Sequence, residues 1–121
     1  MNYIYEATYL DTFKMGNSDL VLKVHQMHES IIKKDYESAG SYLADNVEFR
    51  LEDGSTIEGK ENCMKFMVEG YSSVEIEDYN VAVNLAVTGN NGDEWVLLWD
   101  NGSVVTEDGT SSSFNWMESF Q

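Results

Sequence analysis

The sequence contains no proline and only one cysteine, Cys63. A single cysteine excludes an intramolecular disulfide and a cysteine-based zinc site. Cys63 lies in an apolar helical pattern, and we expect it to be a small buried hydrophobic residue. Because proline is absent, helices and strands can run without that interruption, and turns must rely on glycine, asparagine and aspartate.

Basic residues are also scarce. The 121 residues include 22 acidic and 7 basic side chains, which gives a formal net charge of −15. All basic residues lie at or before Lys65, whereas residues 70–121 contain nine acids and no base. A strongly negative chain repels the phosphates of nucleic acids and the surface of anionic membranes. We therefore expect neither a nucleic acid nor a membrane as a partner.

Long apolar runs are missing as well. No stretch approaches the roughly 18 apolar residues of a membrane span. Residues 1–6 lack the basic and apolar regions of a signal peptide, so we expect a cytoplasmic protein, with an exported form left open if a signal was trimmed. The chain is nevertheless 42% hydrophobic and 12% aromatic, which is enough apolar surface for a core. Its length predicts one domain, residues 18–121, preceded by an N-terminal arm, residues 1–17.

Helical periodicity marks three segments of the domain. Apolar residues recur at helical spacing over residues 19–34, 36–44 and 60–70. Side chains that cap helices precede the first two segments. We expect Asn17 or Ser18 to cap the first helix and Asp35 to cap the second.

Strand periodicity marks the remainder. The alternating segments are 47–51 and 56–58, joined by the turn signal Asp53-Gly54, and the longer segments 73–87, 94–106 and 110–121. The alternation is interrupted at residues 77–79, where we expect a β-bulge. Helices followed by an antiparallel meander predict an α+β fold, with the helices packed on one face of a bent sheet.

One stretch of the sequence resembles a known superfamily. Residues 42–49, Tyr-Leu-Ala-Asp-Asn-Val-Glu-Phe, are followed by Asp53-Gly54 and Gly59-Lys60. Together with the order of the elements over residues 18–121, this resembles the nuclear-transport-factor-2-like superfamily, which includes SnoaL-like and ketosteroid-isomerase-like proteins. The resemblance implies a conical barrel, in which N-terminal helices pack on a strongly bent antiparallel sheet that encloses a pocket. It also implies a homodimer through the outer face of the sheet.

The sequence departs from the pattern of that superfamily in two places. Family members close the sheet with a final strand, but this sequence ends inside the preceding one, so either that strand lies outside the sequence or the first residues take its place. Ketosteroid isomerases carry a catalytic aspartate at the end of the first strand, where this sequence has Phe49, Arg50 and Leu51. This absence opposes isomerase chemistry of that type. SnoaL-like cyclases place their base elsewhere in the pocket, so enzyme activity stays open.

Three polar residues fall within apolar patterns and are candidate catalytic groups. His28 lies on the apolar arc of the first predicted helix, where a histidine can be a general acid or base, or a hydrogen-bonded core residue. Glu118 and Asp100 share strand parity with apolar residues of the last two predicted strands. If those faces point inward, the two carboxyl groups form an acid–base couple; if they point outward, both are solvated acids. His25 and His28 have no evident third ligand, so we expect no metal, and no other cofactor.

Aromatic and hydroxyl side chains provide a predicted pocket lining. The candidates are Phe49, Phe66, Trp95, Trp99 and Trp116, with Tyr42 and Tyr71 as hydroxyl anchors. Each of these residues, taken singly, also suits an ordinary core. As a set they favour a small hydrophobic or mixed-polarity molecule as the ligand.

The sequence thus predicts a small-molecule-binding domain of the SnoaL-like type, with an unspecified ligand. One alternative is a cofactor-free enzyme that carries out acid–base chemistry of the isomerase, cyclase or dehydratase type in the same pocket. The other is a protein-interaction module.

Overall fold

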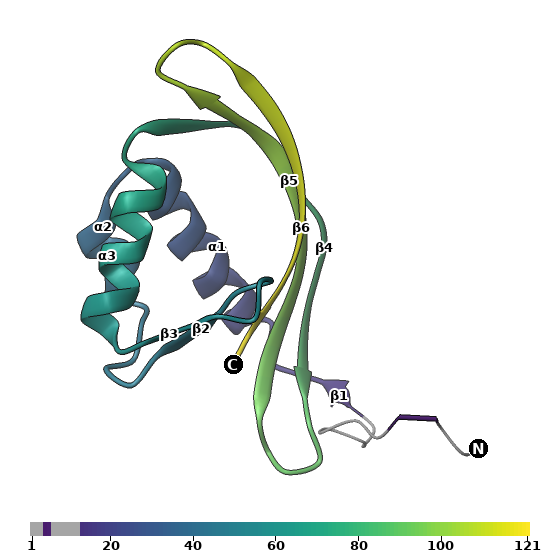
Figure 1. Cartoon of the computed structure of the whole chain (residues 1–121). Helices are drawn as coiled ribbons and strands as arrows, with labels where there is room; N and C mark the ends of the chain where they lie inside the picture. The colour runs from purple at the N-terminus through teal and green to yellow at the C-terminus, as the bar shows by residue number, and fades with distance from the viewer. Residues whose placement is uncertain (1–3, 6–12) are drawn as a thin grey trace.

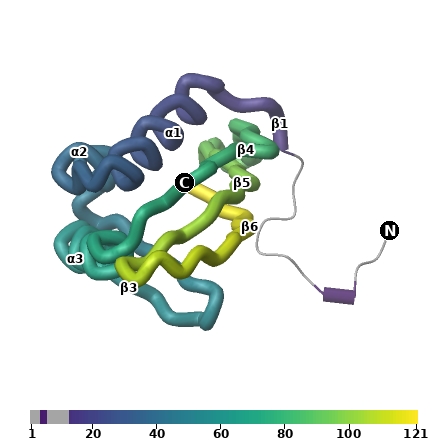
Figure 2. Tube along the Cα trace, turned by 90° about the horizontal axis from the view of Figure 1, so that it is seen from above, coloured from purple at the N-terminus to yellow at the C-terminus, as the bar shows by residue number. Residues whose placement is uncertain are grey.

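The computed structural model describes residues 4–5 and 13–121. Its elements, in chain order, are β1 (Lys14–Met15), α1 (Asp19–Ile32), α2 (Tyr36–Gly40), β2 (Glu48–Arg50), β3 (Thr56–Glu58), α3 (Lys60–Tyr71), β4 (Val74–Thr88), β5 (Glu94–Thr106) and β6 (Ser111–Phe120). The helices lie on the concave side of a strongly bent antiparallel sheet (Figure 1). Seen from above, α1 and α3 lie on the same side of the three long strands (Figure 2). The predicted α+β architecture is therefore confirmed.

Two of the predicted helix caps can be compared with the structure. Asp35 caps α2 as expected, because its carboxylate accepts a 3.2 Å hydrogen bond from the main-chain N–H of Ser38. At α1, Asn17 Oδ1 accepts a 2.9 Å hydrogen bond from the N–H of Asp19, whereas the side chain of Ser18 makes no capping bond. Of the two expected residues, Asn17 is therefore the one whose side chain accepts a hydrogen bond from the first turn of α1.

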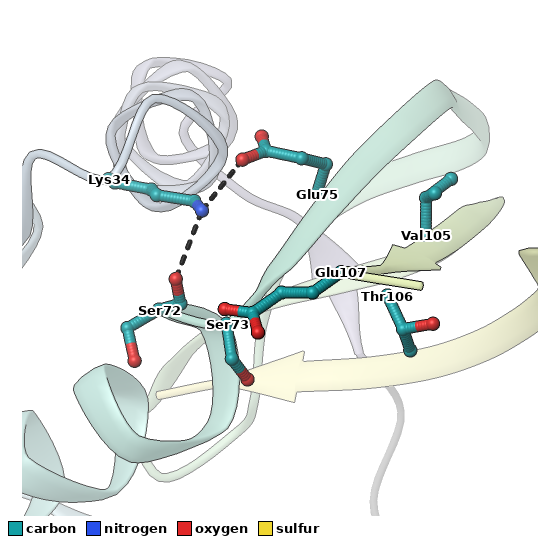
Figure 3. A pocket seen from close by; sticks show the side chains of 7 residues that line it. All are labelled: Lys34, Ser72, Ser73, Glu75, Val105, Thr106 and Glu107. Carbon is teal, nitrogen blue, oxygen red and sulfur yellow. Dashed lines mark hydrogen bonds and ion pairs between the residues drawn. The ribbon is translucent and has the colours of Figure 1, made fainter. Parts of the chain in front are cut away.

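The first two helices are shorter than the periodicity predicts. α1 ends at Ile32 and α2 at Gly40. Just beyond α1, Lys34 adopts a left-handed conformation, with φ 61°. Its Nζ donates a 3.1 Å hydrogen bond to the carbonyl of Ser72 and lies 2.7 Å from a carboxylate oxygen of Glu75 (Figure 3). These contacts fix the end of α1 to the junction between α3 and β4, beside a cavity of about 200 Å³.

The described strands form one four-stranded sheet, in the order β1-β4-β5-β6, and the separate β2–β3 hairpin. β1 pairs with the end of β4, because Lys14 is the register partner of Thr88 and Met15 that of Val87. These residues of the predicted arm thus lie at the opposite edge from β6, and they do not take the place of a strand beyond it. The remaining arm residues, 1–3 and 6–12, lie outside the described residues.

β4 contains the predicted bulge. Glu77 is the register partner of Ser103 and Asn80 that of Asn101, so β4 has one more residue than β5 over this stretch. Asp78 has φ 52°, in the left-handed region that aspartate tolerates better than most residues. As a result, the side of β4 that faces the helices changes here from even-numbered to odd-numbered residues, and a second register shift between Val81 and Val83 changes it back.

The core lies between α1 and the concave face of the sheet. Val24 of α1 packs with Val96 and Leu98 of β5. Strand alternation places the even-numbered residues of β5 on this concave face and the odd-numbered residues on the convex face. Cys63 of α3 is a free, wholly buried thiol, as expected. Within the described ranges, no helix is long and apolar enough to cross a membrane.

Candidate functional site

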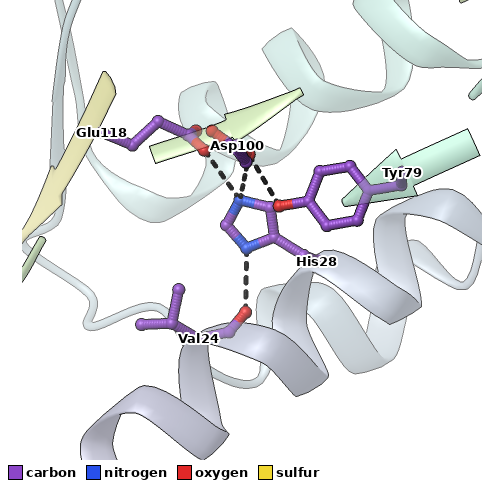
Figure 4. A network of polar contacts seen from close by, with 5 residues as sticks. All are labelled: Val24, His28, Tyr79, Asp100 and Glu118. Atoms are coloured by element: carbon purple, nitrogen blue, oxygen red, sulfur yellow. Dashed lines mark hydrogen bonds and ion pairs between the residues drawn. The ribbon is translucent and has the colours of Figure 1, made fainter. Parts of the chain in front are cut away.

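His28 projects from the buried side of α1 toward the sheet. Its Nδ1 lies 2.8 Å from the carbonyl oxygen of Val24, one turn earlier in the same helix. A carbonyl can only accept a hydrogen bond, so Nδ1 carries a proton and donates. The ring orientation is thereby fixed, and Nε2 points at the concave face of the sheet (Figure 4).

Two carboxyl groups on that face meet Nε2 of His28. Glu118 Oε2 of β6 lies 3.1 Å from it, and Asp100 Oδ2 of β5 lies 4.0 Å from it. Both residues face inward, because Asp100 is even-numbered on β5 and Glu118 is the register partner of the buried Leu98. The structure thus brings together all three residues that the sequence suggests as catalytic groups.

The three groups differ in their access to solvent. The side chain of Asp100 is wholly buried and that of His28 nearly so, whereas 29% of the Glu118 side chain is exposed. Glu118 is therefore the group that a molecule arriving from solvent can touch. His28 and Asp100 lie behind it.

Tyr79 is a fourth member of this polar group, and the sequence pattern did not predict it. Its hydroxyl donates a 2.6 Å hydrogen bond to Asp100 Oδ2. Its ring stacks on the imidazole of His28, with centroids 5.9 Å apart and an angle of 21° between the planes. The signal that could have found it is the bulge predicted at residues 77–79, because a bulge reverses the inward and outward positions that follow.

Charge interactions set the protonation of His28 and Glu118. Burial lowers the pKa of His28, but the hydrogen bond and charge of Glu118 outweigh burial, and the net pKa is raised. Burial raises the pKa of Glu118, but its hydrogen bonds with His28 and Asp100 and the charge of His28 leave the pKa lowered. Both shifts favour an imidazolium paired with a carboxylate, in which Nε2–H donates to Glu118.

Asp100 shifts in the opposite direction. Burial and then a hydrogen bond with Glu118 raise the pKa of Asp100 to about 6, against the hydrogen bond from Tyr79 and the charge of His28. Two carboxyl groups can share a hydrogen bond only if one is protonated, and these shifts place that proton on Asp100 below about pH 6. Burial, followed by the bond to Asp100, raises the pKa of Tyr79, which therefore stays a donor. Burial and the charges of Glu118 and Asp100 also raise the pKa of Tyr71.

The predicted pocket lining does not gather in one place. Trp116 lies on the concave face as the register partner of Asp100, and its ring stacks on Phe114 with centroids 3.9 Å apart. Phe49 and Phe66 make an edge contact between β2 and α3, with centroids 6.3 Å apart.

Three other predicted lining residues do not face the acid–base group. Trp99 lies on the convex face, because its odd number on β5 turns it away from Asp100. Trp95 has the same parity. Tyr42 is partly exposed, and its hydroxyl donates to Gln26 Oε1 at 3.2 Å. Of the predicted lining residues, Trp116 is the one that is paired with Asp100 in the register of β5 and β6.

Among the described residues, one group of side chains has the spacing of metal ligands, and it consists of His28, Asp100 and Glu118. Donor atoms of His28, Asp100 and Glu118 all lie within 4.8 Å of one another, whereas His25 contributes none. The 3.1 Å separation of Nε2 and Oε2 is that of a hydrogen bond. Nε2 cannot donate to Glu118 and coordinate a cation at once. We therefore interpret the group as proton-sharing, and the absence of a metal stays a prediction.

Two solved structures share the architecture of this chain. An LEH-like epoxide hydrolase of M. tuberculosis superposes with a TM-score of 0.68 and 14% sequence identity, over 86% of this chain and 73% of that chain. Aln2 from a Streptomyces species superposes with a TM-score of 0.63 and 15% identity, over 86% of this chain and 79% of that chain. The fold is nuclear-transport-factor-2-like.

The nuclear-transport-factor-2-like fold is what these comparisons show. No protein-family model and no curated protein matches the sequence. At this level of identity the likeness does not extend to activity. The four polar side chains between α1 and the concave face of the sheet are therefore the basis for assigning a function.

Proposed function

We propose that the chain is a SnoaL-like domain that binds a small uncharged molecule against Glu118 and carries out cofactor-free acid–base chemistry on it. The observation that carries this proposal is a partly exposed carboxylate backed by a buried imidazolium and by a buried carboxyl group that is protonated below about pH 6. Perturbed titratable groups that face one another are typical of catalytic sites. The name of one structural neighbour, an epoxide hydrolase, supports chemistry of this class.

The proposed roles follow from access and charge. Glu118 is the catalytic base, because it is ionised and reachable from solvent. It removes a proton from a bound water or from the substrate. His28 stabilises the carboxylate, and below about pH 6 Asp100 holds a proton that can be returned through Glu118. The stacked rings of Phe114 and Trp116 offer an apolar wall beside the base.

Glu118→Gln is expected to abolish turnover while ligand binding is retained. The amide keeps the shape of the side chain but cannot accept a proton, and loss of a general base lowers rates by about 100-fold or more. The probes are cyclohexene oxide and styrene oxide, followed by diol formation, and cyclohexanone, followed by exchange of its α-protons in D₂O. Thermal shift with the same compounds reports binding.

Two further variants make this test decisive. His28→Gln is expected to lower turnover with binding retained, whereas Glu107→Gln, an exposed acid beyond the end of β5, leaves both unchanged. Unchanged turnover in Glu118→Gln would refute the proposed base. Binding of the probes without turnover by the wild-type chain would instead favour a binding domain without catalysis.

We also propose that the convex face of the sheet binds a second copy of the chain. Val83, Trp99 and Met117 form one row across the three long strands, because Trp99 is the register partner of both others. All three are exposed, and 77% of Met117 is accessible. The adjoining outward residues are also uncharged, namely Trp95, Leu97 and Asn101 on β5 and Asn115 and Ser119 on β6. A chain of net charge −15 therefore has a face on which two copies meet without repulsion.

Light scattering at micromolar concentrations is expected to give the mass of a dimer. Met117→Lys is expected to give a monomer, because two lysines would be buried at a symmetric contact. Val68→Lys makes the same change on the exposed side of α3 and should remain dimeric. A monomeric wild-type chain, or equal dissociation in both variants, would remove the proposal.

A further inference from the structure

Tyr79 reaches the acid–base group because of the bulge in β4. Val74 and Ile76 face the helices before the bulge, and Tyr79 and Val81 face them after it. With regular alternation from Ile76, residue 78 would point inward and residue 79 outward. The extra residue, Asp78 with φ 52°, therefore turns the tyrosine toward Asp100.

The contact of Tyr79 distinguishes the two oxygens of Asp100. Oδ2 accepts the hydroxyl hydrogen bond at 2.6 Å. Oδ1 is buried, and no donor among the described residues reaches it. An oxygen that already accepts a strong hydrogen bond is the poorer site for a proton, so Oδ1 is left to carry it. The stack of Tyr79 on His28 fixes the phenol ring in this position.

We propose that Tyr79 is a positioning residue, aimed by the bulge at Asp78, that holds Asp100 Oδ2 and leaves Oδ1 as the proton-carrying oxygen. The importance of this role for catalysis rests on the proposed function. Tyr79 itself acts through Asp100. The same hydrogen bond stabilises the ionised form of Asp100, so it limits how tightly that carboxyl group holds its proton.

The groups that face Asp100 come from four elements. They are His28 on α1, Tyr71 on α3, Tyr79 on β4 and Glu118 on β6. Of these, His28 and Tyr79 oppose protonation of Asp100, and Glu118 favours it. Removing the Tyr79 hydroxyl is therefore expected to move the titration of Asp100 to higher pH.

The test is a titration of Asp100 by NMR in protein labelled with ¹³C at the aspartate carboxyl carbon. Absence of one signal in Asp100→Asn assigns the resonance. In Tyr79→Phe, the midpoint of Asp100 is expected to rise by about one pH unit, the usual effect of a hydrogen bond to a charged group. Tyr71→Phe, which removes a hydroxyl with no bond to Asp100, should leave the midpoint unchanged.

Variants of the bulge test the second half of the proposal. Asp78→Gly keeps the left-handed conformation and should leave the midpoint unchanged. Asp78→Val keeps the chain length but disfavours the left-handed conformation, and regular alternation through residue 78 would turn Tyr79 to the convex face and raise the midpoint as Tyr79→Phe does. If this variant does not fold, Tyr79→Phe alone carries the test, because it leaves the bulge intact.

The outcomes separate this inference from the proposed function. An unmoved midpoint in Tyr79→Phe, or an equal rise in Tyr71→Phe, would overturn the positioning role even if Glu118→Gln abolishes turnover. Full turnover in Glu118→Gln would overturn the catalytic proposal and leave the measured link between Tyr79 and Asp100 standing. The titration needs no substrate, so the two results are independent.

Discussion

His28→Leu is expected to lower the free energy of unfolding by about 2–3 kcal/mol near pH 5 and by clearly less near pH 8. The substitution leaves Glu118 and Asp100 beside each other without the imidazolium that faces both. The raised pKa of His28 gives stability that is fully present below the unfolded value of about 6.5 and is lost as the pH rises through the folded value. Near pH 5 the imidazolium therefore pairs fully with Glu118, whereas near pH 8 that charge is being lost and less remains for the substitution to remove.

Urea denaturation of the variant and the wild type at both pH values measures this effect. The magnitude is set below that of a fully buried ion pair, because part of Glu118 is in contact with water. His25→Leu is the matched control, since His25 lies one turn earlier on α1 and contacts neither acid within the described network. It should have little effect at either pH. Equal losses at both pH values in His28→Leu would mean that His28 contributes through packing alone.

Asp100→Asn is expected to make the protein more stable than the wild type near pH 8, by about 1–2 kcal/mol. The pKa of Asp100 is about 6 in the folded chain, and an unfolded aspartate titrates near 4. The raised pKa stabilises the fold at low pH, and that contribution is lost as the pH rises through about 6. The full shift of two pKa units would be worth about 3 kcal/mol, and sharing of the proton with Glu118 reduces it.

The asparagine cannot ionise, so its curve of stability against pH should be flatter between about pH 4 and 7. The remaining slope comes from His28, whose raised pKa gives stability that is lost as the pH rises, and from Glu118, whose lowered pKa acts in the opposite sense. Glu94→Gln, at an exposed position of the same strand, should give a curve of stability against pH that is parallel to that of the wild type. If the curve of Asp100→Asn is also parallel to that of the wild type, the buried carboxyl group does not titrate as described. The stabilised variant should lose turnover, the usual relation between a strained site and its activity.

Much of the fold could be predicted because apolar periodicity alone specifies it. The three helices, the hairpin and the three long strands occur where spacing places them, and helix ends differ where local hydrogen bonds decide. Lys34, for example, leaves the helical conformation although its apolar neighbours continue the pattern. Periodicity shows which side of an element is apolar, but it does not show where a single residue changes the direction of the backbone.

The site was predictable to the same extent. His28, Asp100 and Glu118 could be found because each places a polar group within an apolar pattern, and burial of that pattern forces them inward. Which strand face is inward depends on packing against α1, so the roles of Trp99 and Trp116 could not be separated from parity alone. Tyr79 was missed because its inward position exists only after the extra residue of the bulge is counted.

The pair of His28 and Glu118 joins positions 90 residues apart in the chain. Closing so long a loop costs entropy that is recovered only when the last strand is in register with its neighbour. We therefore expect the polar centre to form late in folding, because one partner lies in the first helix and another on the last strand. A chain emerging during synthesis has His28 long before it has Glu118, and until then the imidazole has no carboxylate partner on β6. We thus expect assembly of the polar centre and completion of the long-range topology to occur together.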